Sequence, residues 1–215
     1  ESFDFLNKIP DRYENLKKIQ NSFLQCYFDS PNTQATFKIL IDDEEYNFSR
    51  YNFFLVNYLL SKDKKKEAEK TIIDARKKND SNLLLKQSEH FILKRKKTKI
   101  KKFFNCKNPK DVLAEVFYVI ANLYSSQQDY QLSNFYLNIS FFLNEKFTPN
   151  NTLLAENLFH QKKYNRSKKV YHSLKSIGSV YSWYASKNIA IILQNLKDVD
   201  YLPIKLEKEF NLLSN

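Results

Sequence analysis

A single glycine, Gly178, occurs among the 215 residues of this chain. Glycine provides the positive-φ turns and the close backbone approach on which phosphate-binding loops depend. The chain therefore contains no P-loop, no dinucleotide-binding fingerprint and no nucleophile elbow, because each of these motifs requires glycines at fixed positions. Hairpin-rich β-sandwiches and barrels are disfavoured for the same reason. The composition thus predicts a mainly helical protein.

The net charge of +11 has two explanations. It could attract an acidic partner such as nucleic acid or an anionic surface. It could also reflect the nucleotide bias of an AT-rich genome, because Lys, Asn, Phe, Tyr and Ile are abundant while glycine is scarce. Only five of the 35 basic residues are arginine, the side chain that reads guanine best. We favour compositional bias over a nucleic-acid partner.

Helical periodicity runs through most of the chain, and strand-like alternation is sustained nowhere. The predicted helices cover residues 11–27, 31–41, 50–61, 65–77, 81–94, 110–125, 132–143, 148–160, 167–174, 182–196 and 203–213. Ser30 before Pro31 and Ser49 are predicted to cap the helices that follow them. Short connections between the helices predict antiparallel helical hairpins.

The residues that carry catalysis or bind metals are few and scattered. His90, His160 and His172 are isolated, and no His-x-x-x-His or Cys-x-x-Cys spacing occurs. Cys26 and Cys106 have no disulfide spacing signature, so we expect two buried, unpaired thiols, with a single disulfide as the alternative. The sequence predicts no enzyme, no catalytic residue, no cofactor and no metal site.

The chain also lacks an apolar run long enough to span a membrane, since the longest, residues 53–60, is interrupted by Asn57. We expect a soluble protein without a transmembrane segment. Residue 1 is not methionine, which indicates that it lies inside a longer product or follows a cleavage site. The compartment is therefore cytoplasmic or, if a signal peptide has been removed upstream, periplasmic.

A repeat of 34 residues emerges when Ala121 is aligned with Ala155. In this register Gln128-Asp129-Tyr130 matches Lys162-Lys163-Tyr164, and Ser133 matches Ser167. Small residues at these positions allow two helices to approach closely while large neighbours fill the space beside them. An earlier copy contains Ala68, Ile72 and Ala75.

This helix–turn–helix unit resembles the tetratricopeptide repeat (TPR), with Ala121, Ala155, Gln128 and Lys162 in place of its glycines. Segments 129–137 and 181–185 are similar to the C-terminal part of alphaproteobacterial TPR proteins. The match is good for 114–182, fair for 49–81 and 182–196, and poor for 1–30 and 83–107; a generic helical bundle is the alternative. The resemblance implies an all-α solenoid of about six stacked antiparallel hairpins in a right-handed superhelix. Degenerate hairpins would cover 1–107, the best of them 49–81. TPR-like repeats and a C-terminal capping helix would cover 108–215, all in one continuous solenoid.

In TPR arrays the first helices of successive hairpins line a groove that binds a partner peptide or helix. By position, the resemblance implies these groove residues: Glu115, Tyr118, Asn122, Ser125, Thr152, Glu156, Phe159 and His160. Asn122 matches an asparagine used to clamp C-terminal carboxylates, but Tyr118, Thr152 and Glu156 stand where the clamp needs cations. The resemblance therefore implies a scaffold with an aromatic and polar groove for a protein partner, and it leaves homo-oligomerisation open.

A basic stretch supplies the alternative function, binding of nucleic acid or an anionic surface. Its cations are Lys94, Arg95, Lys96, Lys97, Lys99, Lys101 and Lys102. Phe91, Phe103 and Phe104 flank the stretch, and we expect them to anchor the core rather than to stack on bases. The competing interpretation is a solvated helix end or linker between repeats.

Overall fold

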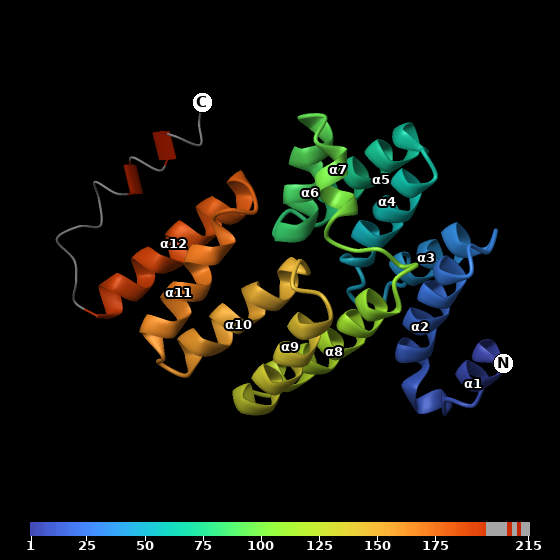
Figure 1. Cartoon of the computed structure of the whole chain (residues 1–215), viewed down its shortest axis with the longest axis horizontal. Helices are drawn as coiled ribbons and strands as arrows, with labels where there is room; N and C mark the ends of the chain where they lie inside the picture. Colours follow the sequence, from blue (N-terminus) through green and yellow to red (C-terminus); the bar gives the residue numbers. More distant parts are fainter. Residues whose placement is uncertain (197–205, 208–209, 212–215) are drawn as a thin grey trace. The chain divides into compact units, whose positions relative to one another are not determined.

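The computed structural model describes residues 1–196, 206–207 and 210–211, and these residues form helices and loops without any β-strand (Figure 1). The chain divides into two compact units, an N-terminal unit of Glu1–Val112 and a C-terminal unit of Leu113–Asn215. The all-α prediction is confirmed. The prediction of one continuous solenoid divided at residue 107 stays a prediction.

The N-terminal unit is a series of helices in which each packs against the next along the chain. Its helices are α1 (Ser2–Asn7), a 3₁₀ turn (Asp11–Tyr13), α2 (Glu14–Tyr27), α3 (Thr33–Ile41), α4 (Tyr51–Ser61), α5 (Lys65–Lys78), α6 (Leu83–Leu93) and α7 (Lys97–Lys101). Helix α4 is buried along almost its whole length and also contacts α6 and α7, so it forms the centre of this unit.

The C-terminal unit continues the pattern after α8 (Pro109–Ser126), which crosses the boundary between the units. The helices that follow are α9 (Tyr130–Leu143), α10 (Thr148–His160), α11 (Tyr164–Leu174) and α12 (Ser179–Asn195). Tyr136 of α9 stacks on Tyr124 of α8 with ring centres 5.6 Å apart. The predicted helix at 203–213, which is the expected C-terminal capping helix, falls mainly outside the described residues.

Five left-handed residues divide the chain at nearly regular intervals. Asp29, Asp63, Arg95, Gln128 and Lys162 have φ between 55° and 64°, and they follow one another after 34, 32, 33 and 34 residues. Each lies directly after the first helix of a hairpin, namely α2, α4, α6, α8 and α10. The repeat therefore extends from α2 to α11. It includes residues 14–30 and 83–107, where the sequence match to the repeat is poor.

The five turns share one hydrogen-bond pattern. After α8, the Gln128 amide donates to the Ser125 carbonyl and the Asp129 amide donates to the Tyr124 carbonyl, both at 3.0 Å. The same two bonds recur at the other four turns, and they define the Schellman end of a helix, where glycine is usual. Gly178 itself has an extended backbone before α12. Non-glycine residues thus occupy each of these five left-handed turns.

A second regularity lies seven residues before each left-handed residue, where the side chain is buried. These positions hold Ser22, Val56, Ser88, Ala121 and Ala155, each at most 1% exposed. The serine hydroxyls are satisfied inside their own helices, because Ser22 donates to the Lys18 carbonyl and Ser88 to the Leu84 carbonyl. Small residues therefore permit close helix contact in four of the five hairpins, as the sequence predicts for Ala121 and Ala155.

The core of the N-terminal unit combines aromatic rings with a disulfide. Phe54 lies 5.0 Å from Phe23 and 4.6 Å from Phe104, measured between ring centres. Beside them Cys26 is bonded to Cys106, which corrects the expectation of two unpaired thiols. The pairing escapes sequence analysis because the repeat, rather than the sequence spacing, brings the end of α2 to the loop after α7.

Both predicted serine caps are wrong. Helix α3 begins at Thr33 with Asn32 at its N-cap, because the residues between Ser30 and Thr33 form a turn in which Ser30 Oγ accepts from the Asn32 amide. Helix α4 has Arg50 at its N-cap, and Ser49 Oγ instead accepts a hydrogen bond from Asn82 Nδ2. A local turn at Ser30 and a tertiary contact at Ser49 have taken over groups that local pattern assigns to capping.

Candidate functional site

The predicted groove residues lie on α8 and α10, the first helices of two successive hairpins in the C-terminal unit. Asn122 and His160 are exposed, and His160 stacks on Tyr130 with ring centres 5.5 Å apart. Phe159 is half-buried and contacts Tyr164. The side chain of Glu115 is fully buried.

Tyr118 and Thr152 are half-buried groove residues held by local packing. The Tyr118 ring meets Phe147 edge-on with ring centres 5.6 Å apart, and it packs on a core cluster that includes Ala121 and Leu153. The Thr152 hydroxyl donates back to the Thr148 carbonyl at 3.3 Å. The small Ala121 and the cluster around it therefore bring Tyr118 of α8 against α10.

Glu156 of the predicted groove is held by a tyrosine from another helix. The Tyr184 hydroxyl of α12 donates to its carboxylate, and Tyr184 also shares a hydrogen bond with Tyr171 of α11. Burial raises the pKa of Glu156, although the Tyr184 hydrogen bond and the nearby His160 oppose the shift. Burial likewise raises the pKa of Tyr171 to about 12. Sequence analysis did not identify either tyrosine as a neighbour of Glu156.

Ser125 faces an internal network centred on Asn157. The Ser125 hydroxyl donates to Asn157 Oδ1 at 2.6 Å, and Asn157 Nδ2 donates to Ser133 Oγ at 2.7 Å and to Asn134 Oδ1 at 3.0 Å. Asn157 is fully buried, so it joins α8, α9 and α10 through satisfied polar groups. Nothing in the sequence marks Asn157, because a single asparagine in an asparagine-rich chain carries no signal.

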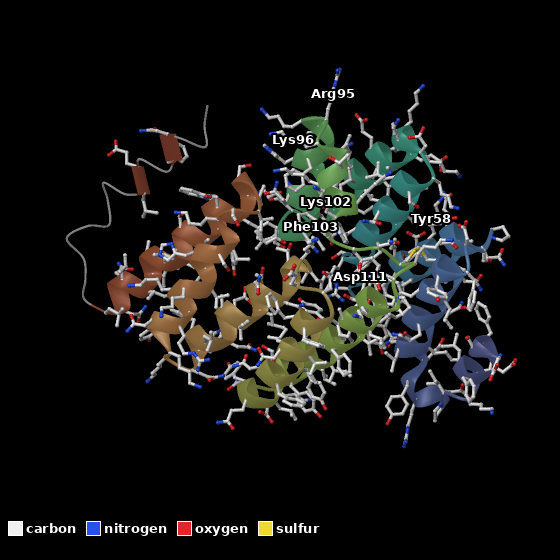
Figure 2. The ribbon with its side chains drawn as sticks, in the orientation of Figure 1. Tyr58, Arg95, Lys96, Lys102, Phe103 and Asp111 are labelled. Carbon is white, nitrogen blue, oxygen red and sulfur yellow. A yellow bond between two sulfur atoms is a disulfide. The ribbon has the colours of Figure 1, made fainter. Side chains whose placement is uncertain are left out.

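The basic stretch lies in the N-terminal unit and folds around α7, which sequence analysis did not predict. Arg95 and Lys96 point away from the turn between α6 and α7 (Figure 2). Lys94, Lys99, Lys101 and Lys102 are also exposed, whereas the side chain of Lys97 lies outside the described part of the chain. Phe91 and Phe104 are both 2% exposed, which confirms that they anchor the core. The structure does not favour base stacking at this stretch.

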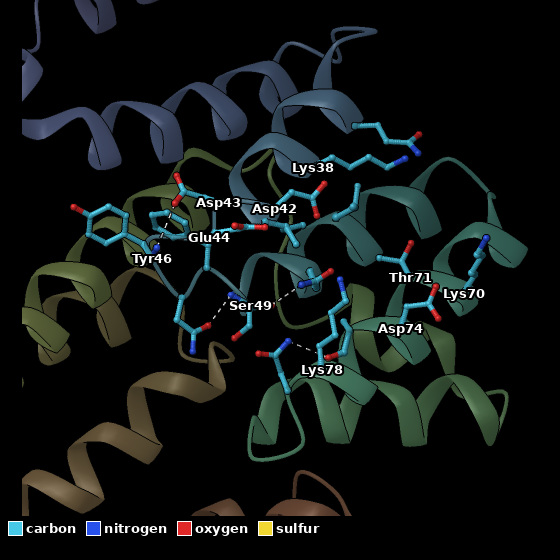
Figure 3. Close-up of a pocket in the computed structure, with 18 of the residues that line it drawn as sticks. Lys38, Asp42, Asp43, Glu44, Tyr46, Ser49, Lys70, Thr71, Asp74 and Lys78 are labelled. Carbon is cyan, nitrogen blue, oxygen red and sulfur yellow. Dashed lines mark hydrogen bonds between the residues drawn. The ribbon is translucent and has the colours of Figure 1, made fainter.

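A pocket of about 880 Å³ opens between α3 and α5 in the N-terminal unit (Figure 3). Gln34 and Lys38 of α3 line one side, and Lys70, Thr71 and Asp74 are among the α5 residues on the other. The loop with Asp42, Asp43 and Glu44 closes one end, and Leu55 of α4 contributes from between the two helices. Sequence analysis did not predict this pocket.

Asp43 fixes the acidic loop at the edge of this pocket. Its carboxylate accepts hydrogen bonds from the amides of Glu45 and Tyr46, at 3.1 and 3.3 Å, and pairs with Lys18 of α2 at 3.2 Å. The Lys18 ammonium lowers the pKa of Asp43, and the carboxylate in turn raises the pKa of Lys18. The carboxylate is therefore committed to holding the loop.

The C-terminal unit has a corresponding groove between α9 and α11. Two adjoining pockets of about 500 and 520 Å³ share Lys169 and Val170. The first pocket is lined by Gln131, Asn134, Asn138, Leu154, Leu158, Gln161, Lys163, Arg166, Lys169 and Val170. We call the two pockets together the α9–α11 groove. Sequence analysis missed it, although α9 and α11 contain no acidic residue.

The described residues contain neither a membrane-spanning helix nor a metal-binding cluster. No helix among them is long and apolar enough to cross a membrane. Within the same residues, no group of three or more His, Cys, Asp or Glu side chains is arranged to hold a metal ion.

Comparison with known proteins gives little guidance. No protein-family model and no curated protein matches the chain. Among solved structures, the chain is similar to a tetratricopeptide repeat protein from Parabacteroides merdae, with 12% sequence identity and a TM-score of 0.33. The alignment covers 94% of this chain and 99% of that protein, and at this level of similarity no function transfers.

Proposed function

We propose that the chain is a non-enzymatic protein-interaction scaffold whose first-helix surface in the C-terminal unit binds a partner peptide or helix. We call this surface the first-helix face, and its residues are Tyr118, Asn122, Thr152, Glu156 and Phe159. The observation that carries the proposal is the Tyr184–Glu156 hydrogen bond, which links the faces of α12 and α10. It orients a carboxylate among half-buried aromatic and hydroxyl side chains on neighbouring helices.

The chemistry of this face favours a partner with an apolar side chain and a hydrogen-bond donor. Tyrosine and phenylalanine supply large contact areas at a low cost in side-chain entropy, and aromatic anchors dominate many protein interfaces. Glu156 is partly desolvated, so a donor that reaches its carboxylate gains more than it would in water. The narrower likeness to alphaproteobacterial TPR proteins stays a prediction.

Capture of partners from a nuclease-treated lysate by the full chain tests this function. Tyr118→Ala combined with Phe159→Ala should reduce capture of the specific partners at least tenfold. Asn122→Arg should do the same by adding bulk and charge at an exposed position without disturbing the core. The matched control is Phe135→Ala with Phe142→Ala, because both phenylalanines are exposed on α9, away from the first-helix face.

Substitutions in the basic stretch test the alternative function, binding of an anionic partner. If Lys96, Lys97, Lys99 and Lys101 are all changed to Glu, partner capture should persist provided that circular dichroism shows an intact fold. Loss of all capture in that variant, with the first-helix variants unaffected, would contradict the scaffold proposal and support an anion-binding function.

A further inference from the structure

The α9–α11 groove lies between the second helices of two hairpins, so it is distinct from the first-helix face. One wall carries the amides Gln131, Asn134 and Asn138 of α9, and the other carries Lys163, Arg166 and Lys169 beside or on α11. Leu154 and Leu158 of α10 contribute apolar surface between the walls. The groove therefore has an uncharged polar wall, a cationic wall and an apolar floor.

Among the described residues, no carboxylate pairs with the cations of this groove. Arg166 and Lys169 are exposed and one helical turn apart, and neither side chain forms an ion pair or a hydrogen bond with another described residue. Among the described residues that line the two pockets, Glu145 in the loop after α9 is the single carboxylate. Side chains of one sign that converge on a cleft favour a ligand of the opposite sign.

The amide wall suits a peptide backbone. Asn134 Oδ1 accepts a hydrogen bond from the buried Asn157, which orients the side chain. Asn138 and Gln131 are exposed on the same side of α9. An amide side chain both donates and accepts hydrogen bonds, as a peptide group does. The wall can therefore pair with the backbone of an extended segment.

The size of the groove limits the ligand to a short segment. The α11 wall runs from Lys163 to Ser173, a helical length of roughly 15 Å at 1.5 Å per residue. An extended chain advances about 3.3 Å per residue, so about five residues fit along it. Because alternate side chains of an extended segment point in opposite directions, acidic and apolar side chains can reach the cationic wall and the floor respectively.

We propose that the α9–α11 groove binds an extended acidic peptide segment of a partner protein, with acidic residues alternating with apolar ones. Arg166 and Lys169 bind the carboxylates, and Val170, Leu154 and Leu158 accept the apolar side chains. A nucleic acid fits this groove less well, because a phosphate backbone is best matched by a continuous track of cations. The proposal stands independently of the first-helix face.

Fluorescence anisotropy of a labelled octapeptide of alternating Glu and Leu tests the proposal on the full chain. We expect saturable binding that weakens as salt is added. The octapeptide of alternating Gln and Leu should bind at least tenfold more weakly. Arg166→Glu combined with Lys169→Glu should weaken binding of the Glu–Leu peptide at least tenfold.

The matched control is Lys168→Glu combined with Lys187→Glu, which makes the same change in net charge on α11 and α12 outside the groove. This control should bind the Glu–Leu peptide with an affinity within about twofold of that of the unsubstituted chain. The Tyr118 and Phe159 variants of the first-helix face should also leave the affinity for the Glu–Leu peptide unchanged. The proposals for the first-helix face and for the α9–α11 groove can therefore fail separately.

Three results would overturn the proposal. One is the absence of saturable binding by the Glu–Leu peptide, and another is an equal loss of affinity in the control and groove variants. The third is tighter binding of an eight-residue oligothymidylate than of the Glu–Leu peptide. That result would show that the cations of the groove bind phosphate rather than carboxylate. Circular dichroism of each variant confirms that the fold persists.

Discussion

The two units present equivalent grooves with different charges. Counted from the left-handed residues Asp63 and Lys162, Glu67 of the N-terminal unit corresponds to Arg166, Lys70 to Lys169, and Asp74 to Ser173. Leu55 and Leu154 also correspond, and each contributes to its own groove from the intervening first helix. The repeat thus reproduces the position of the groove in both units.

The difference between the grooves lies in their exposed side chains. The N-terminal pocket mixes Lys38, Lys70 and Lys78 with the carboxylates of Glu67, Asp74 and the acidic loop. The α9–α11 groove keeps the cations and has almost no carboxylates. A helical repeat therefore sets where a groove forms, and the surface residues determine which ligand chemistry it accepts.

The two units also differ inside. The N-terminal unit joins an aromatic core to the Cys26–Cys106 disulfide, whereas the C-terminal unit buries a polar network around Asn157. Ser140 Oγ adds to the polar interior, within 2.6 Å of the Ala114 carbonyl and 2.8 Å of Asn150 Oδ1. Distinct interiors mean that each unit can be destabilised separately.

The largest expected effect comes from the disulfide. Cys26→Ser combined with Cys106→Ser should lower the free energy of unfolding of the N-terminal unit by about 2–5 kcal/mol, because the bond closes a long loop in the unfolded chain. Unit-resolved hydrogen exchange should show faster exchange in α2, α4 and α6, and little change in α10 and α11. Equal loss of protection in both units would show that they unfold together.

The buried asparagine should be the next most sensitive position. Asn157→Leu leaves Ser125 and Ser133 without their partner, which should cost the C-terminal unit about 1–3 kcal/mol. Urea unfolding followed by the fluorescence of Trp183, the single tryptophan of the chain, measures the loss in this unit. The control Asn165→Leu, at an exposed position of α11, should change stability by less than about 0.5 kcal/mol.

Exchange of groove residues tests the comparison of the grooves directly. Glu67→Arg combined with Asp74→Ser gives the N-terminal pocket the residues found at the corresponding positions of the α9–α11 groove. In a chain that also carries Arg166→Glu and Lys169→Glu, this exchange should restore part of the affinity for the Glu–Leu octapeptide. We expect a gain of about tenfold, or about 1.4 kcal/mol. No gain would mean that the acidic loop or the wall geometry also determines binding.

The left-handed turns should give the smallest effect. Gln128→Gly and Lys162→Gly should each stabilise the C-terminal unit by about 1 kcal/mol, because glycine relieves the steric cost of a positive φ. Asp63→Gly should stabilise the N-terminal unit by a smaller amount, since Asp tolerates the left-handed region better than Gln or Lys does. Thermal unfolding measures all three. Gly178→Ala, at an extended position, is the control and should change stability little.

Local pattern predicted most helices of this chain, but it could not predict the groups recruited by tertiary contacts. Helices from α2 to α12 follow the predicted periodicity closely, except for the short α7. The pattern predicts that Ser30 and Ser49 cap helices, yet Ser30 accepts a hydrogen bond within a turn and Ser49 accepts one from Asn82. The match to the repeat is poor in the segments around Ser22 and Ser88, because serine there replaces the small apolar residue that makes the pattern visible.

At the candidate sites too, local sequence pattern does not predict which groups the tertiary structure brings together. The groove residues inferred by resemblance lie on α8 and α10, but nothing in their pattern indicates that Tyr184 of α12 binds Glu156 or that Asn157 binds Ser125. Both grooves between second helices went unrecognised, since their walls come from helices about 30 residues apart. A cleft of this kind has no signature in any single stretch of sequence.

The sequence by itself determined that the chain is helical, that its hairpins repeat about every 34 residues, and that small residues mark the close helix contacts. These properties follow from short-range periodicity and side-chain size, which act within one or two helices. Only the tertiary structure decided the disulfide, the left-handed turns, the Asn157 network and the charge of each groove. Each of these depends on groups from different helices or on backbone dihedrals, and stacking the repeats brings them together.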